Sequence, residues 1–187
     1  MTDLTFRPAR YAATSRALHW IVAVLVLTTL PIGVVMLQDG LSRDLQNTLF
    51  ILHKNGGVFI LALVVLRLVW RVWAPAPPLP ASVPPLQARI ARLAHGALYA
   101  LLLVMAISGY IRVRAGGFPI EMLDAIGFPP LVPRSDALAD TAKWVHGTAR
   151  YALAALILAH IAAGLNHLRL RDGVFDRIWP PFGRGRV

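Results

Sequence analysis

Six histidines and the absence of cysteine decide what chemistry this chain of 187 residues can perform. Zinc bound by thiolates, iron–sulfur clusters held by cysteine and covalent cofactor attachment through a C-x-x-C-H motif are all excluded. A metal centre in this chain must therefore be built from histidine or carboxylate side chains. Because six His stand against only nine Asp and Glu, histidine is the stronger candidate.

Four of the histidines fall at two depths if the chain is helical around them. His146 and His160 are 14 residues apart, which is about 1400° of helical rotation and only about 40° short of four full turns. Both imidazoles would then face the same bundle interior, about 21 Å apart along the helix axis. His19 and His53 lie near the ends of two other apolar segments. We therefore expect one layer of His53 with His146 and another of His19 with His160.

Four apolar blocks supply the helices that would position these layers. They cover about residues 17–37, 49–73, 89–111 and 143–168, and each is long enough for the roughly 30 Å hydrocarbon core of a bilayer. Only 15% of the residues are charged, against about 25% in an ordinary soluble domain. The first block is longer than the apolar part of a secretory signal, and no cleavage site follows it. The sequence predicts an all-α integral membrane protein, a single domain over residues 1–187 forming a four-helix transmembrane bundle.

Two of the connections have a character of their own. Residues 74–80 read APAPPLP, a stiff extended linker that no helix could contain. Residues 112–142 form a longer, amphipathic segment, which we expect to lie across the helix ends.

Positive charge predicts the topology. The N-terminal segment, the Pro-rich connection and the C-terminal tail hold 12 of the 19 Lys and Arg residues, and the opposite side holds 7. The larger group is Arg7, Arg10, Arg16, Arg67, Arg71, Arg89, Arg92, Arg169, Arg171, Arg177, Arg184 and Arg186. The positive-inside rule then places both termini in the cytoplasm, as in a multi-pass protein of the bacterial inner membrane. The net charge of +10 fits this topology and contact with anionic lipid, and no nucleic-acid-binding module is present.

Two histidines that face each other across a bundle core are suited to be the axial ligands of a haem iron. Zinc is the competing metal, but it would want four ligands, and each layer offers only two strong candidates without a nearby carboxylate. Without cysteine the haem must be non-covalent, hence b-type. The sequence thus predicts two b-type haems, which make an electron path across the membrane. Glycines beside the histidines (Gly56, Gly57, Gly147, Gly164) would let a flat macrocycle approach, although plain helix contacts explain them equally well.

The remaining histidines need separate interpretations. His95 lies about two turns inside the third block and could compete with His160 or His19 as a ligand. His167 follows His160 by seven residues on nearly the same face, about 10 Å nearer the cytoplasm. It could donate a hydrogen bond to a quinone carbonyl, or it could be an interfacial histidine in contact with solvent.

Cations beside the layers would offset the two propionates of each haem. Lys54 and Arg150 belong to the periplasmic layer, and Arg150 is one turn from His146. Arg16 belongs to the cytoplasmic layer.

At these residues the chain resembles the bacterial cytochrome b561 family, over nearly its whole length. The matching stretches are Arg10-Tyr11, Leu18-His19-Trp20, His53-Lys54-Asn55-Gly56, Arg67 with Arg71, Leu93-Ala94-His95, and Trp144-x-His146 with His160. The resemblance implies a di-haem bundle with His19/His160 and His53/His146 as ligand pairs. One branch of the family is a superoxide:ubiquinone oxidoreductase, and other members are cytochrome b subunits of hydrogenases and formate dehydrogenases. The compact layout of this chain is similar to the first branch.

Two classes of function follow from these expectations. In the first, the chain is an enzyme that oxidises periplasmic superoxide and reduces ubiquinone. Periplasmic cations would attract the anionic substrate, namely Lys54, Arg112, Arg114, Lys143 and Arg150. In the second, the chain is a carrier subunit that moves electrons between the quinone pool and a separate redox protein docked on residues 112–142.

Overall fold

The computed structural model of the protein describes residues 10–182, and every regular element in that range is helical. In chain order these are α1 (Ala13–Val35), α2 (Arg43–Trp73), α3 (Pro85–Ala115), α4 (Glu121–Ala125), α5 (Asp136–Leu170) and the 3-10 turn η1 (Phe175–Arg177). The helices α1, α2, α3 and α5 are each long and apolar enough to cross a membrane. The predicted all-α fold with four apolar helices is thereby confirmed for the described residues. Three of the cations counted for the topology, Arg7, Arg184 and Arg186, lie outside that range.

Helices α2, α3 and α5 begin before the apolar blocks because their start signals lie outside those blocks. Ser42 caps α2, since its Oγ accepts a hydrogen bond from the Leu45 N–H at 3.3 Å, and Ser135 caps α5 in the same way. Helix α3 opens on Pro85, whose missing N–H leaves no hydrogen bond unmade at that position. Helix α5 ends where Arg171 adopts the left-handed conformation, with φ of 53°.

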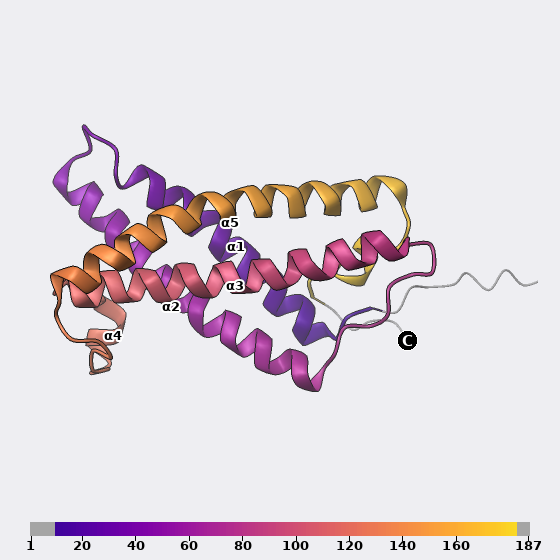
Figure 1. Cartoon of the computed structure of the whole chain (residues 1–187), viewed down its shortest axis with the longest axis horizontal. Coiled ribbons are helices and arrows are strands. Elements are labelled where there is room, and N and C mark those ends of the chain that lie inside the picture. Colours follow the sequence, from indigo (N-terminus) through magenta and orange to yellow (C-terminus); the bar gives the residue numbers. More distant parts are fainter. Residues whose placement is uncertain (1–9, 183–187) are drawn as a thin grey trace, which may run out of the picture.

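The four long helices form two closely packed pairs, with a seam filled by side chains between α5 and the pair of α1 and α2. Helix α3 packs along α5, α1 packs along α2, and α2 joins the pairs by packing on α3. By contrast, α5 makes no close backbone contact with α1 or α2 in the described part of the chain. Figure 1 shows α4 at one end of this bundle and the linker after α2 at the opposite end. Buried Val22, Val26, Ile60 and Val64 form the core at mid-height.

The chain after α5 folds back onto the start of α1. The Trp20 indole N–H donates to the Ile178 carbonyl at 3.1 Å, and the Arg16 guanidinium donates to the Pro180 carbonyl at 2.9 Å. Arg177, also buried, donates to the carbonyl of Pro77 in the linker. The end of the bundle opposite α4 is therefore held by three segments that are far apart in sequence.

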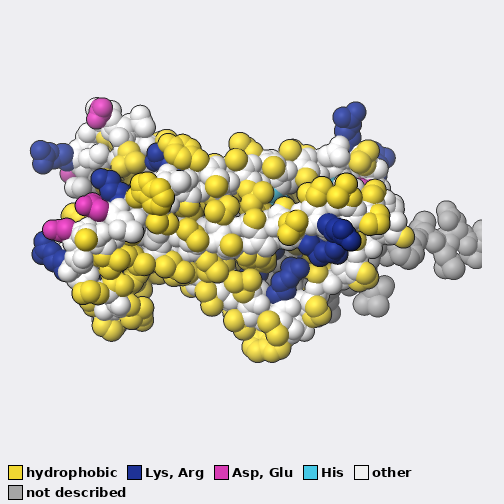
Figure 2. All heavy atoms as spheres, viewed as in Figure 1, with side chains coloured by type: hydrophobic (Ala, Val, Ile, Leu, Met, Phe, Trp, Pro, Cys, Tyr) yellow, Lys and Arg dark blue, Asp and Glu magenta, His cyan; other side chains and the backbone are white. Residues whose placement is uncertain are grey.

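Most of the apolar side chains lie on the outside of the bundle. Figure 2 shows them over the middle of the molecule, while charged side chains gather toward the two ends. Large apolar residues such as Val24, Phe59 and Leu158 are at least half exposed on three different helices. A surface of this kind suits a surrounding of lipid, in which apolar side chains need no protein cover.

Candidate functional site

The two histidine layers expected from the sequence are present as two opposed pairs of rings. We call His53 of α2 and His146 of α5 the α4-side pair, and His19 of α1 and His160 of α5 the η1-side pair. In each pair the ring centroids are 6.2 Å apart and the ring planes are nearly perpendicular, at 82° and 75° respectively. Each pair spans the seam, because one ring comes from α5 and the other from α1 or α2.

Backbone carbonyls hold both rings of the α4-side pair. His53 Nδ1 lies 3.0 Å from the Thr29 carbonyl oxygen, and His146 Nδ1 lies 2.9 Å from the Met105 carbonyl oxygen. A carbonyl oxygen only accepts hydrogen bonds, so each Nδ1 must carry the proton. The lone pair of each ring is therefore on Nε2, the tautomer that a metal-binding histidine needs.

Two glycines make room for the α4-side rings. A methyl group added at Gly33 of α1 would stand 2.5 Å from His53 Cε1, and one at Gly109 of α3 would stand 3.1 Å from His146 Cε1. Each imidazole thus packs directly against the backbone of a neighbouring helix. The sequence had drawn attention to other glycines, and at Gly57, Gly147 and Gly164 an added methyl group would meet no atom within 4 Å. At the fourth, Gly56, it would stand 2.8 Å from Thr29 Oγ1.

Side chains rather than carbonyls surround the η1-side pair. The Arg67 guanidinium lies 2.9 Å from His19 Nδ1, and because arginine only donates, this Nδ1 is an acceptor. A third imidazole, His95 of α3, contacts His160 with ring centroids 5.4 Å apart. Arg67 also lies over the ring of Tyr99, 5.6 Å from its centroid. This end of the seam therefore combines three histidines with a half-buried cation.

The ring spacing of both pairs fits a haem iron, but at the η1-side pair the Arg67 contact would have to break first, because an Nδ1 that accepts a hydrogen bond leaves the proton on Nε2. An iron bound at about 2 Å by an imidazole nitrogen on each side would separate the two ring centroids by about 6 Å, which is the separation in both pairs. The seam also keeps the backbones of α5 and α1 or α2 apart where a flat macrocycle would have to enter. No group of three or more His, Asp or Glu that could hold a metal ion occurs among residues 10–182. Each layer thus offers two opposed imidazoles, which would hold a haem iron between them.

The cations predicted from sequence lie in different surroundings. Arg16 is buried, and its guanidinium donates to the carbonyls of Tyr11 and Pro180, both at 2.9 Å. Arg150 is half-buried, and its guanidinium donates to the hydroxyl of Tyr151 at 2.6 Å. Sequence reasoning did not assign Arg67 to the η1-side pair, which it contacts directly.

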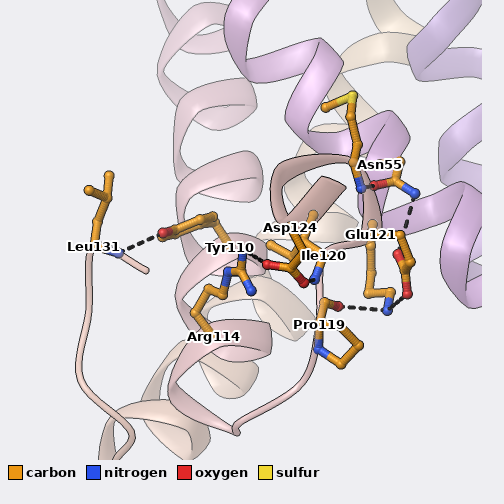
Figure 3. A network of polar contacts seen from close by, with 10 residues as sticks. Asn55, Tyr110, Arg114, Pro119, Ile120, Glu121, Asp124 and Leu131 are labelled. Atoms are coloured by element: carbon orange, nitrogen blue, oxygen red, sulfur yellow. Dashed lines mark hydrogen bonds and ion pairs between the residues drawn. The ribbon is translucent and has the colours of Figure 1, made fainter. Parts of the chain in front are cut away.

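Lys54 is held by Pro119 and Glu121 at the start of α4, both of which are labelled in Figure 3. Its ammonium donates to Glu121 Oε1 at 2.6 Å and to the Pro119 carbonyl at 2.8 Å, and only 13% of the side chain is exposed. Asn55 adds bonds to Glu121 and to the Met122 N–H. Partial burial would raise the pKa of Glu121, but these hydrogen bonds, first of all that from Lys54, bring the pKa below its usual range. Lys54 therefore anchors α4 rather than standing free at the surface.

Arg112 is a second cation that sequence reasoning did not single out for the haem. It lies in the last turns of α3, half-buried, and within electrostatic reach of both His53 and His146. Its neighbour Arg114 instead binds Asp124 of α4 at 2.6 Å, as Figure 3 shows. The lowered pKa of Asp124 has its main cause in that hydrogen bond.

His167 lies beside a cavity at the η1 end of the bundle. The cavity has a volume of about 300 Å³ and is lined by His167, Leu168, Arg171, Gly173, Phe175 and Asp176. His167 Nδ1 is 2.5 Å from Asp172 Oδ2, and its Nε2 is 3.5 Å from the amide nitrogen of Gln87 in α3. Neither Asp172 nor Gln87 could be found from the sequence, because only the turn after α5 and the packing of α3 bring them to His167.

A series of aromatic contacts connects this cavity with the η1-side pair. Phe175, in the cavity wall, stacks on Trp179 with ring centroids 6.1 Å apart. Trp179 contacts Trp20 at 5.5 Å, and Trp20 contacts His19 at 5.4 Å. The cavity and the histidine pair are thus linked through adjacent rings.

An all-helical bundle whose four spans enclose opposed histidine pairs defines the class of membrane-bound b-type cytochromes. A family model described as prokaryotic cytochrome b561 matches residues 10–181, and the chain belongs to this family, which confirms the resemblance found in the sequence. It is a membrane protein of electron transfer, and membership of the family implies b-type haem.

Two curated relatives cover most of the chain. It is 33% identical over 166 residues to "Cytochrome b561 homolog 2" of Escherichia coli (strain K12), covering 88% of each chain. It is 26% identical over 176 residues to "Probable superoxide oxidase CybB" of Yersinia pestis, covering 91% of this chain and 96% of that one. The first name gives a cytochrome family, and the second gives an activity.

Proposed function

We propose that this chain binds two b-type haems and carries electrons across the bacterial inner membrane. The observation that carries this proposal is the pair of opposed imidazoles at each of two depths, with centroids 6.2 Å apart in both. His53 and His146 would hold one haem, and His19 and His160 the other. The haem-to-protein ratio and the redox spectrum of the purified chain test it. Two non-covalent haems per chain are expected, and a ratio of one, or a covalently bound haem, would contradict the proposal.

Bound haem would supply one-electron transfer, and the protein side chains prepare its place. The carbonyls of Thr29 and Met105 hold the proton on Nδ1 of the α4-side rings, which leaves Nε2 free as a ligand. Arg112 at one pair and Arg67 at the other bring positive charge to places where haem carboxylates would need it. His95 is proposed as a neighbour of His160 rather than as a ligand, because His19 already faces His160 at the ligand spacing.

We further propose superoxide as the electron donor and ubiquinone as the acceptor. Two superoxide anions each lose one electron and become O2, while one ubiquinone gains two electrons and two protons and becomes quinol. The relative from Yersinia pestis, called a probable superoxide oxidase, supports this assignment. Superoxide would react at the α4 end, where Arg150 and Arg112 are half-buried cations and Lys54 is paired with Glu121. Of the steering residues inferred from sequence, Arg150 thus has the stronger case.

The acceptor site is proposed at the cavity beside His167. A volume of about 300 Å³ lies at the lower end of the range for small-molecule sites, and His167 offers a hydrogen bond to a quinone carbonyl. The aromatic contacts through Trp20 and Trp179 end in the cavity wall at Phe175. With both termini in the cytoplasm, as the positive-inside rule predicts, the α4 end faces the periplasm and the cavity faces the cytoplasmic side.

A purified-protein assay separates this enzyme from a carrier subunit. The chain alone, with added ubiquinone, should consume superoxide. The alternative is favoured by one observation: Phe118, Ile126 and Leu131, in the connection around α4, each expose about two thirds of their side chains outside the four spans. Such a surface would suit a redox partner protein. Intact di-haem protein that does not react with superoxide would establish the carrier function instead.

A further inference from the structure

The turn after α5 brings a carboxylate onto His167. Arg171 adopts a φ of 53°, so the chain reverses, and Asp172 returns to a residue five positions earlier in the helix. One carboxylate oxygen, Oδ2, is 2.5 Å from His167 Nδ1, and the other accepts the Val174 N–H at 3.0 Å. The contact is therefore fixed from both sides, by the end of the helix and by the turn that follows it.

The carboxylate of this pair is ionised and lies on the imidazole. Partial burial would raise the pKa of Asp172, but the hydrogen bonds from His167 and from the Val174 N–H bring it below its usual range. An ionised carboxylate on Nδ1 fixes the tautomer of a histidine and stabilises its protonated form. The Nε2 atom remains for proton exchange. In this structure the Gln87 amide nitrogen, a donor, lies 3.5 Å from it, so Nε2 is an acceptor here and takes up a proton from water before each transfer.

The position of the pair joins the cavity to solvent. His167 lines the cavity and is 13% exposed, while the Asp172 side chain is 20% exposed. The other charged groups that line the cavity are Arg171 and Asp176. A proton can thus reach the imidazole from the aqueous side without crossing the membrane-spanning part of the bundle.

We propose that Asp172 and His167 deliver the protons for quinone reduction in this cavity, an inference that rests on the proposed function. The histidinium breaks its Nε2–H bond, and a new O–H bond forms at a quinone oxygen. Water on the same side then reprotonates Nε2, and two such transfers accompany the two electrons that superoxide supplies. Asp172 is a positioning residue, because it touches the imidazole and not the quinone.

The experiment compares two electron acceptors in the di-haem protein. Reduced protein is mixed in a stopped-flow instrument with ubiquinone-1, which takes up protons, or with ferricyanide, which does not, and haem oxidation is followed in H2O and D2O. Asp172→Asn keeps an oxygen for the Val174 N–H but removes the charge. We expect it to slow the ubiquinone-1 reaction by about 10- to 100-fold, to increase its solvent isotope effect and to leave the ferricyanide rate unchanged. His167→Gln should do the same, and Asp172→Glu should restore part of the rate.

A measurement of ubiquinone-1 binding and a matched control variant distinguish a proton relay at Asp172 from a purely structural role of that residue. Calorimetric titration with ubiquinone-1 should give Asp172→Asn an affinity within twofold of the original chain. Asp39→Asn removes the same charge from an exposed loop at the α4 end and should change nothing. A ubiquinone-1 rate unaffected by Asp172→Asn, or an equal slowing with both acceptors, would overturn the relay alone. An original chain that reduces ferricyanide but not ubiquinone-1 would overturn the proposed quinone reaction and the relay with it.

Discussion

The two histidine pairs have the same ring spacing, but backbone groups hold one pair and side chains surround the other. Around the α4-side pair, backbone carbonyls fix both tautomers and two glycines let the rings lie against neighbouring helices. Around the η1-side pair, the contacts come from other side chains, Arg67 on His19 and the His95 ring on His160. Backbone groups cannot leave their places while the helices persist, whereas a guanidinium can turn away. The comparison indicates that the first pair is preorganised for a metal and the second is adjustable.

The strongest test of the comparison removes one ligand at a time. We expect His53→Ala or His146→Ala to lower the haem content from two per chain to one, with loss of the α4-side haem only. His19→Ala or His160→Ala should remove the other haem, because each haem would then lose one of its two protein ligands. Pyridine haemochrome assays and redox titration measure both effects. If His95→Ala removes a haem while His160→Ala keeps both, the assignment of ligands must be redrawn.

The second test adds a single carbon to the glycines that lie against the α4-side pair. Gly33→Ala should weaken haem binding at the α4-side pair by about 10- to 100-fold, the usual cost of disturbing the support of a metal ligand, because the new methyl group would stand 2.5 Å from His53 Cε1. Gly109→Ala should do less, at 3.1 Å from His146. Haem titration of the protein gives the affinities. Gly96→Ala is the control, because an added methyl group there meets no atom within 4 Å. Equal effects of all three variants would argue against a role of Gly33 and Gly109 in making room for the histidine rings.

The third test removes the positive charge beside the η1-side pair. Arg67→Gln should lower the reduction potential of the η1-side haem, since a nearby cation favours the electron-rich reduced state. The expected shift is on the order of 50 mV, measured by spectroelectrochemical titration. The α4-side potential should stay unchanged, as Arg67 contacts His19 and not that pair. A shift of both potentials by the same amount would show that the two pairs are not electrostatically separate.

The smallest expected effect concerns the approach of superoxide to the α4 end. Reduction of the haem there should slow as salt rises, because the screening length falls from about 10 Å at 0.1 M to about 3 Å at 1 M ionic strength. Arg150→Gln should slow it a few-fold at low salt. Lys54→Gln should act chiefly by releasing the charge of Glu121, with which Lys54 is paired, so Lys54→Gln together with Glu121→Gln should come back close to the original rate. Stopped-flow rates that change neither with salt nor with the Arg150→Gln substitution would rule out electrostatic steering of superoxide.

The sequence predicted what depends on one helix at a time. The number and nature of the spans, and the common face of His146 and His160, follow from hydropathy and helical geometry alone. Apart from the pairing of the histidines by depth, contacts between helices were beyond it, because they depend on axial register: nothing in the order of residues says that Gly33 meets His53 or that Arg67 meets His19. The same holds for Lys54, whose partner Glu121 lies 67 positions later in a short helix that no apolar pattern indicates.

The seam between α5 and the pair of α1 and α2 has a consequence for how the protein is made. Helix α5 reaches α1 and α2 through side chains, namely the histidine pairs and Ile157 on the core cluster, and not through close backbone contact. In a chain loaded as proposed, the free energy of cofactor binding would therefore also join the two halves of the bundle, as in small proteins that fold around their metal. Insertion of the four helices into the bilayer and their final assembly become separate events in biogenesis. Cells short of haem would then accumulate an inserted but incomplete precursor, exposed to the proteases that survey the membrane.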